Sequence, residues 1–291
     1  MFRRIILSLL AACMMFTAAV PAFAAEANWP EKIRIGFIPT EGGADILERF
    51  KPLMEHLESS LGIKVEGFSA SDYAGIITAM SHNHIDFAYF GPKSYVEASE
   101  KANAQALALE LNKEGQPGYT GLIIVRKDSP IAKLDEIKGH VFAFTDPNST
   151  SGYLVPNVLF ARDMKVKPEE YFKEVKFSGS HGASILAVKN GGVEVAATNN
   201  IDLDRMIEKG QVEKDDFRIL WTSELIPGAP MAARADLPES LKAAFTKALL
   251  ELNNNPVVIG KLQNGGYQAT DDKTYDIIRY LQRLKSQLAA K

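Results

Sequence analysis

The chain has 291 residues, of which 46% are hydrophobic and 24% are charged. This length allows one large domain or two modest lobes with their own cores, and the composition excludes a disordered or collagen-like chain. Acidic residues outnumber basic ones, 36 to 33, so no basic surplus indicates a nucleic-acid partner. The single cysteine, Cys13, excludes a disulfide framework and any metal site built from several cysteines.

The N-terminus has the pattern of a secretory signal peptide. Arg3 and Arg4 precede an apolar run over residues 5–20, and the small residues that follow predict cleavage after Ala24. Cys13 follows Leu-Ala-Ala, as in a lipoprotein signal, but the run stays apolar beyond it, which favours the soluble form. Cleavage removes two arginines and no acid, so the formal net charge changes from −3 to −5. We therefore expect a periplasmic protein whose signal peptide is residues 1–24.

Strands and helices alternate from the start of the mature chain. The hydrophobic patterns predict, in this order, strand 32–39, helix 41–61, strand 64–70, helix 73–82 and strand 85–90. Gly62 ends the first helix, Ser71-Asp72 caps the second, and Pro92 marks the first turn of a third. This alternation predicts a parallel sheet covered by helices.

The remainder of the chain predicts a second set of alternating strands and helices. Strands 104–111 and 119–126 precede it and lead out of the first set. The elements of the second set are helix 131–138, strand 141–145, a helix after Asn148-Ser149-Thr150, strand 175–178, helix 183–189, strand 193–198, helix 203–209 and strand 217–222. Amphipathic helices 238–253 and 273–290 close the chain.

Two α/β lobes follow from this order: residues 28–118 with 226–291, and residues 119–225. Extended segments near 112–120 and 223–232 join them, so we expect a ligand cleft between the lobes. In such sheets ligands bind at the carboxyl ends of the strands, next to helix N-termini.

The segment 145–153 is the most informative of the strand-to-helix junctions. Ser149, Thr150 and Ser151 place three hydroxyls in a row beside free backbone N–H groups at the start of a helix. An anion there would accept hydrogen bonds from both kinds of donor, and the helix dipole would add to the attraction. An ordinary helix cap uses only one such hydroxyl, so a capping role and an anion site both remain open.

Three other junctions carry polar side chains. Tyr73 follows Asp72, His181 stands in a turn of small residues, and Asp202 follows Asn199-Asn200. Taken singly, a tyrosine packed on its lobe or a capping histidine explains these residues equally well. Their recurrence at matching junctions of both lobes is what predicts an anion-binding cleft.

Catalytic and metal-binding signatures are scarce. The zincin, nucleophile-elbow, P-loop and dinucleotide-binding motifs are absent from the sequence. His82-Asn83-His84 is interpreted as a solvated turn between a helix and a strand. Ser, His and Asp all occur, but no pattern places a base beside a nucleophile. We therefore predict no catalytic residue, no metal and no cofactor.

At these junctions the sequence resembles the phosphonate-binding periplasmic proteins of ABC importers, a branch of the type II solute-binding fold. The resemblance runs from about residue 33 to about 235 in the family's order. Its most specific string is Asp146 to Gly152; others are Asp72 to Ile77, Lys127 to Ile131, Gly179 to His181, Ala197 to Asn200 and Leu225 to Gly228.

The resemblance implies a two-lobed α/β protein of the type II periplasmic-binding fold that closes on a phosphonate and delivers it to an ABC permease in the inner membrane. It implies that the phosphonate oxygens are held by residues Tyr73, Tyr119, Ser149, Thr150 and His181, with the neighbouring Ser151. Relatives that take 2-aminoethylphosphonate hold its ammonium with two carboxylates. Asp202 matches one, and Ala229 stands where the other is expected.

Because Ala229 replaces the second carboxylate, the ligand could be either 2-aminoethylphosphonate or a simple alkylphosphonate. Phosphite and phosphate are alternative anions. An exported enzyme acting on a small phosphorylated metabolite in the same cleft is the alternative from another class.

Overall fold

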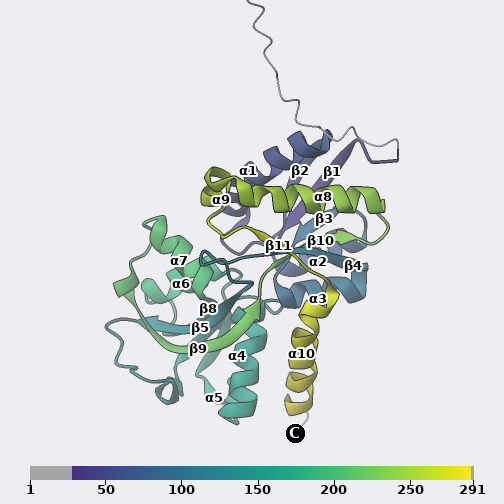
Figure 1. The fold of residues 1–291 in the computed structure, drawn as a ribbon. Helices are drawn as coiled ribbons and strands as arrows, with labels where there is room; N and C mark the ends of the chain where they lie inside the picture. The colour runs from purple at the N-terminus through teal and green to yellow at the C-terminus, as the bar shows by residue number, and fades with distance from the viewer. Residues whose placement is uncertain (1–27, 290–291) are drawn as a thin grey trace, which may run out of the picture.

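The structure, a computed structural model, describes residues 28–289, which form two lobes around two β-sheets (Figure 1). The six strands of the first sheet lie in the order β11-β4-β10-β3-β1-β2. β1 is parallel to its neighbours β2 and β3, whereas β10 is antiparallel to β3 and β4, and β11 is antiparallel to β4. Their bounds are β1 Lys32–Phe37, β2 Lys64–Ser69, β3 Phe87–Tyr89, β4 Ala104–Glu110, β10 Pro230–Arg234 and β11 Tyr267–Ala269.

The second sheet has five strands in the order β7-β6-β8-β5-β9. β6 is parallel to β7 and β8, and β5 is antiparallel to β8 and β9. Their bounds are β5 Gly118–Arg126, β6 Val141–Phe144, β7 Glu174–Phe177, β8 Val195–Asn199 and β9 Phe217–Pro227. β9 is longer than the predicted strand 217–222, and only two residues separate its end from the start of β10. The chain therefore crosses between the sheets as extended backbone.

Helices α1, α2, α3, α8 and α9 belong to the first lobe, and their apolar faces form its core with the sheet. Phe37 stacks on Phe50 of α1 at 4.5 Å between ring centroids, and Phe87 stacks on Phe245 of α8 at 3.9 Å. Burying side chains of this size stabilises the fold by about 1.5–3 kcal/mol each. The bounds are α1 Gly43–Leu61, α2 Tyr73–Ser81, α3 Pro92–Ala102, α8 Glu239–Glu251, η5 Leu252–Asn254 and α9 Pro256–Leu262.

The second lobe departs from the predicted helices in two places. Residues 131–138 form only a short 3-10 turn, η1. The predicted helix after Thr150 is a π turn, an α turn and a second π turn in succession, and π turns are frequent at functional sites. The bounds are η1 Leu134–Ile137, η2 Thr150–Leu154, α4 Val155–Val158, η3 Leu159–Asp163, α5 Pro168–Tyr171, α6 His181–Lys189, α7 Asn200–Glu208 and η4 Lys214–Asp216.

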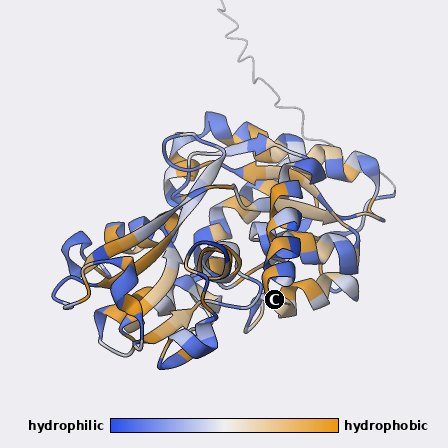
Figure 2. Ribbon diagram, turned by 90° about the horizontal axis from the view of Figure 1, so that it is seen from below, coloured by the Kyte–Doolittle hydropathy of each residue, from blue (hydrophilic) through white to orange (hydrophobic). Residues whose placement is uncertain are grey.

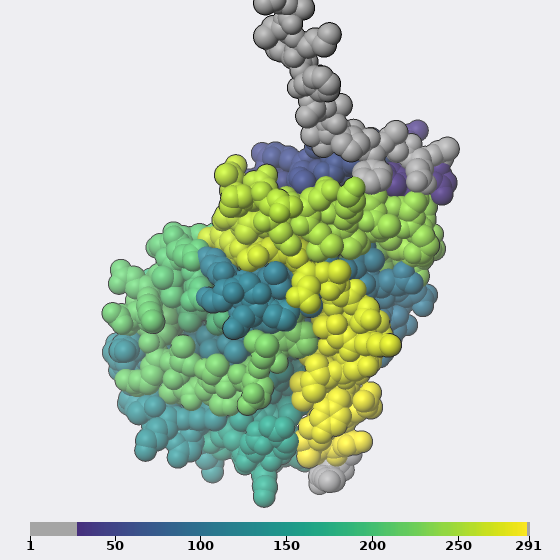
Figure 3. Space-filling view, in the orientation of Figure 1, coloured from purple at the N-terminus to yellow at the C-terminus, as the bar shows by residue number. Residues whose placement is uncertain are grey.

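The C-terminal segment touches both lobes. A 3-10 turn, η6 (Asp272–Tyr275), leads into α10 (Asp276–Ala289), which contacts α3 of the first lobe and η2, α4 and η3 of the second. Figure 3 shows α10, in yellow, lying along the second lobe. In Figure 2 hydrophobic residues gather on the strands of both sheets; the first lobe has one core cluster, and the second has a cluster on each face of its sheet.

Candidate functional site

A small closed cavity of about 40 Å³ lies between the lobes, where the parallel strands end. Six of the seven predicted ligand-binding residues line it, and the seventh, Ser151, is buried but is not part of its wall. The cavity is lined by Ile38, Thr40, Tyr73, Tyr89, Gly91, Glu110, Tyr119, Ser149, Thr150, His181, Asn199, Ile201, Asp202, Arg205 and Ala229. The site is therefore enclosed by both lobes.

Five helical segments begin at this cavity: α2, α3, η2, α6 and α7. Four of them have a side-chain cap, which satisfies a backbone N–H and fixes where the helix starts. The caps are Asp72 on Gly75 N at 2.7 Å, Ser149 on Gly152 N at 3.0 Å, Ser180 on Ala183 N at 3.0 Å and Asn199 on Asp202 N at 2.8 Å. The positive ends of these helix dipoles converge on the cavity, which favours an anion there.

The turn before η2 is held in place by its own sequence. The Ser149 hydroxyl accepts from Gly152 N, and the Thr150 hydroxyl accepts from Lys93 N of α3 at 2.8 Å. A Cβ on Gly152 would overlap Thr145 Oγ1, so only glycine fits at this position. Both hydroxyls accept from the backbone, so each could donate its own proton to a ligand.

His181 lies at the start of α6 and joins the junctions of the second lobe. Its Nε2 lies 3.3 Å from Ser149 Oγ, and its Nδ1 lies 3.3 Å from Thr198 Oγ1 and 3.4 Å from Thr145 Oγ1. Burial lowers the pKa of the imidazole, and the charge of Asp202 opposes that shift only in part. The imidazole is therefore neutral in the closed, empty site.

Several buried hydroxyls at the site have no hydrogen-bond partner among residues 28–289. They include Tyr73 OH and Thr40 Oγ1, which both line the cavity. Burial, together with the charges of nearby carboxylates, raises the pKa of Tyr73 well above its ordinary value, so its phenol keeps its proton. Buried polar groups are nearly always satisfied in proteins, and an unsatisfied one costs about 1–3 kcal/mol. A ligand that accepts hydrogen bonds would remove this cost.

The cavity also has a charged part, of which the sequence analysis named only Asp202, and we call it the ionic cluster: Glu41, Arg49, Glu110, Asp202 and Arg205. Glu110, Asp202 and Arg205 form cavity wall. Arg205 Nη2 lies 2.8 Å from Glu110 Oε1, and its Nη1 lies 3.6 Å from Asp202 Oδ1. Arg49 pairs with Glu41 at 2.5 Å and lies 3.6 Å from Glu110.

Two carboxylates of the ionic cluster, Glu110 and Glu41, are ionised. Burial raises the pKa of Glu110, but the charges of Arg205 and Arg49 outweigh burial and hold that pKa below its ordinary value. The same balance, with Arg49 and Arg205 opposing burial, lowers the pKa of Glu41. The one sequence signal for the cluster is the spacing of Asp202 and Arg205, three residues apart on a helix. Glu110 and Arg49 come from β4 and α1, and only the tertiary fold brings them to this site.

Hydrogen bonds and ion pairs cross from one lobe to the other around the cavity. Besides the Arg205–Glu110 and Lys93–Thr150 contacts, the side chain of Lys209 reaches Glu41. The distances are Gly182 N to Thr40 O 3.2 Å, Tyr73 N to Asp146 Oδ2 3.4 Å, Lys93 Nζ to Asn148 Oδ1 2.9 Å and Lys209 Nζ to Glu41 Oε2 2.5 Å. The structure is thus a closed form, and a ligand can enter only if the lobes separate.

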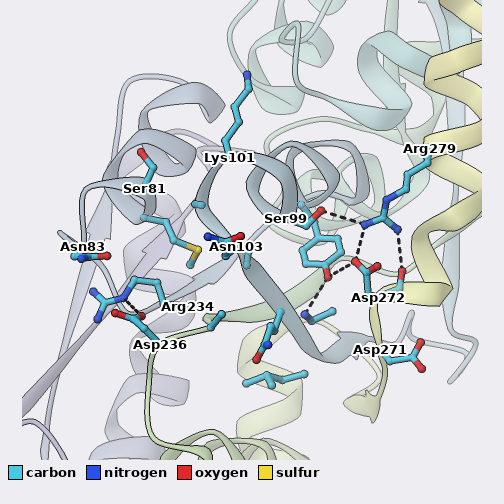
Figure 4. Close-up of a pocket in the computed structure, with 18 residues that line it drawn as sticks. Ser81, Asn83, Ser99, Lys101, Asn103, Arg234, Asp236, Asp271, Asp272 and Arg279 are labelled. Atoms are coloured by element: carbon cyan, nitrogen blue, oxygen red, sulfur yellow. Dashed lines mark hydrogen bonds and ion pairs between the residues drawn. The ribbon is translucent and has the colours of Figure 1, made fainter.

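A larger cavity, of about 890 Å³, lies on the first lobe beside α3, β4 and the C-terminal segment (Figure 4). Four of its charged side chains pair with one another: Arg279 with Asp272 at 2.6 Å and Arg234 with Asp236 at 2.7 Å. Tyr95 OH also donates to Asp272, at 2.8 Å. None of the predicted ligand-binding residues lines this cavity, so we place the functional site in the small cavity between the lobes.

The segment His82-Asn83-His84 is an exposed turn between α2 and β3. His82 and His84 are exposed on the turn after α2, and His82 Nδ1 lies 3.0 Å from Thr78 O. Residues 28–289 contain no group of three or more His, Cys, Asp or Glu side chains placed to hold a metal ion. Within the same range, no helix is long and apolar enough to cross a membrane. The predicted signal peptide and Cys13 lie outside the described residues.

Residues 35–275 match the family model described as "ABC transporter, phosphonate, periplasmic substrate-binding protein". The chain belongs to this family. It is 33% identical to the phosphonates-binding periplasmic protein of Escherichia coli, over 98% of this chain and 86% of that one. It is also 33% identical to the phosphate-import protein PhnD of Mycolicibacterium smegmatis, over 81% of this chain and 80% of the other.

The fold is shared with a solved relative. The binding protein component of an ABC phosphonate transporter from Pseudomonas aeruginosa superposes with a TM-score of 0.83 at 32% identity, covering 89% of this chain and 87% of that one. The family and this neighbour confirm the predicted two-lobed periplasmic-binding fold and the predicted role in solute binding for transport. The family consists of periplasmic solute-binding proteins, which rules against the alternative of an exported enzyme.

Proposed function

We propose that this protein captures a small phosphonate in the closed cavity and delivers it to an ABC permease in the inner membrane. The observation that carries the proposal is the convergence of five helical N-termini on a cavity that also holds the unpartnered hydroxyl of Tyr73. An anion with three oxygens would accept hydrogen bonds from these donors and would benefit from the helix dipoles.

The roles of the predicted residues follow from the contacts of each. Ser149 and Thr150 donate their hydroxyl protons to the anion, because their oxygens already accept from the backbone. The phenols of Tyr73 and Tyr119 donate from the two sides of the cleft, and His181 donates from Nε2 as a neutral imidazole. Ser151 supports the turn from outside the cavity wall, and Asp202 faces the substituent on phosphorus.

Inorganic phosphate or phosphite is the second candidate, because the closed cavity is small. About 40 Å³ fits a compact tetrahedral anion more readily than a long substituent. A curated relative is named as a phosphate-import protein, which supports weighing this anion.

A thermal-shift panel of methylphosphonate, 2-aminoethylphosphonate, phosphite, phosphate and sulfate tests the proposal. A ligand present at a thousandfold excess over its Kd stabilises the folded form by about 4 kcal/mol. We expect the largest rise in Tm with a phosphonate; a larger rise with phosphate or phosphite selects the second candidate. Stabilisation by sulfate alone overturns both. Mass spectrometry of the ligand after long incubation should recover it unchanged.

Closure of two lobes is part of the proposed function. We assign residues 28–118 and 226–291 to one lobe and 119–225 to the other, with the cavity between them. The hinges are then the segments that follow β4 and β9.

For export, we propose a periplasmic protein released by cleavage after Ala24, with lipid attachment at Cys13 as the alternative. The intact mass of the protein recovered from the periplasm distinguishes the two: a chain that begins at Ala25 supports cleavage, and one that begins at a lipidated Cys13 overturns it.

A further inference from the structure

Asp202 offers one acceptor to the substituent on phosphorus. Its side chain is about 6% exposed and lines the cavity. Its Oδ2 accepts from Asn199 Nδ2 at 2.7 Å, whereas its Oδ1 has no hydrogen-bond partner among residues 28–289. The substituent on phosphorus should therefore carry a group that can donate a hydrogen bond to Asp202 Oδ1.

Arg205 affects which kind of hydrogen-bond donor is suited to Asp202 Oδ1. Its guanidinium lies one helical turn from Asp202, lines the same cavity and faces both Asp202 and Glu110. Asp202, Glu110 and Glu41 carry three negative charges, and Arg205, Arg49 and Lys209 carry three positive charges against them. This part of the site is therefore neutral before a ligand arrives.

A neutral site of this kind disfavours a ligand ammonium. An ammonium would lose its hydration and find a carboxylate whose charge Arg205 already offsets, and Ala229 adds only a methyl group to the wall. A hydroxyl would donate to Asp202 Oδ1 without bringing a charge into the cavity. An alkyl group would leave that oxygen unpartnered, at the cost of a buried unsatisfied acceptor.

We propose that Arg205 is a specificity-determining residue that makes the cavity select a short phosphonate with a hydroxyl over its ammonium and alkyl counterparts. This inference rests on the proposed function, since it assumes that the phosphonate group occupies the hydroxyl-rich part of the cavity. Because the cavity is small, we consider substituents of one or two carbons.

Isothermal titration calorimetry with matched ligands tests the proposal on the wild-type protein. The two-carbon set is 2-hydroxyethyl-, 2-aminoethyl- and ethylphosphonate, and the one-carbon set is hydroxymethyl-, aminomethyl- and methylphosphonate. In the set that binds more tightly, we expect the hydroxyl ligand to have a Kd about threefold to tenfold lower than each of the other two. A smaller margin over either ligand, or tightest binding of the amine, overturns the inference.

Variants on α7 separate specificity from closure. Arg205→Gln keeps hydrogen-bonding capacity but removes the charge that offsets Asp202, so the ratio of the hydroxyl Kd to the amine Kd should rise about tenfold. Glu208→Gln is the matched control, because Glu208 of α7 also pairs across the lobes, with Lys113, but neither lines the cavity nor belongs to the charges counted above. It should weaken all three ligands by the same factor and leave their ratios unchanged.

The outcomes distinguish this inference from the function on which it rests. If no phosphonate in either set binds, the proposed function fails and the inference fails with it. If phosphonates bind but Arg205→Gln leaves the ratios as they are in the wild type, the function stands and Arg205 is not the determinant. If Arg205→Gln does not fold, the wild-type ranking still decides whether the cavity selects a hydroxyl.

Discussion

The backbone N–H of Lys93 donates to the hydroxyl of Thr150 across 2.8 Å, and the two residues come from opposite lobes. This contact forms only when the cleft is closed, and it turns the remaining hydroxyl proton of Thr150 toward other acceptors. A single side chain thus takes part both in joining the lobes and in the donor set of the cavity.

Thr150→Val should weaken phosphonate binding by about 1.5–3 kcal/mol, because it removes a hydrogen bond to a charged group while keeping the branched shape of the side chain. Thr150→Ser is the matched control and should retain most of the affinity. Calorimetry of the three proteins provides the measurement. Equal affinity of the valine variant and the wild type would exclude Thr150 from the donors to the ligand.

Tyr73→Phe removes a buried hydroxyl that has no hydrogen-bond partner among residues 28–289. We expect the free energy of unfolding without ligand to stay the same or to increase, since no hydrogen bond is lost. Affinity for the phosphonate should fall at least about tenfold. Denaturant unfolding and calorimetry on the same preparation test the two parts, and a loss of stability with unchanged affinity would make Tyr73 a structural residue.

The stability of the ligand-free closed form should decrease in acid through His181. Its pKa is lowered in the closed site, so the unfolded chain takes up a proton at a higher pH than the folded one. The contribution of the neutral imidazole is complete above about pH 6.5 and is lost as the pH falls toward the lowered pKa. Unfolding free energies at pH 7.5 and 5.5 measure this loss. His181→Gln should show a smaller difference between the two pH values; an identical difference contradicts the assignment.

The lobes should close on ligand binding, because each supplies only part of the donors around the cavity. Small-angle scattering should give a smaller radius of gyration with saturating ligand than without it. The Tyr73→Phe variant, measured at a ligand concentration that saturates only the wild type, should keep the larger value. A scattering profile that does not change in the wild type would show that closure does not accompany binding.

The strand-to-helix units could be predicted from the sequence because their signals are local. Asp72, Ser149, Ser180 and Asn199 each cap the helix that they precede, and the donors of the site stand at those same junctions. The prediction of a helix over residues 131–138 was wrong, since those residues form only a 3-10 turn between loop segments. β11 was missed because it is a three-residue strand at the edge of its sheet.

The ionic cluster could not be predicted in the same way. Glu110 ends β4, and its partners Arg49 and Arg205 lie far from it in the chain on α1 and α7. No periodic or capping pattern indicates such a pairing, because it depends on how the two lobes meet. Ala229 alone suggested a departure from relatives with two acids, and the neutralising role of Arg205 is visible only in three dimensions.

Helix α10 lies away from the cavity, but its contacts should affect how long the ligand stays bound. Arg279 donates to Ser99 of α3 at 3.1 Å, and Lys285 donates to the phenol of Tyr153 in η2 at 2.8 Å. Separation of the lobes must break one of these attachments, so their strength adds to the barrier that release has to overcome. Substitutions on α10 should therefore change the residence time of the ligand, although α10 does not line the cavity.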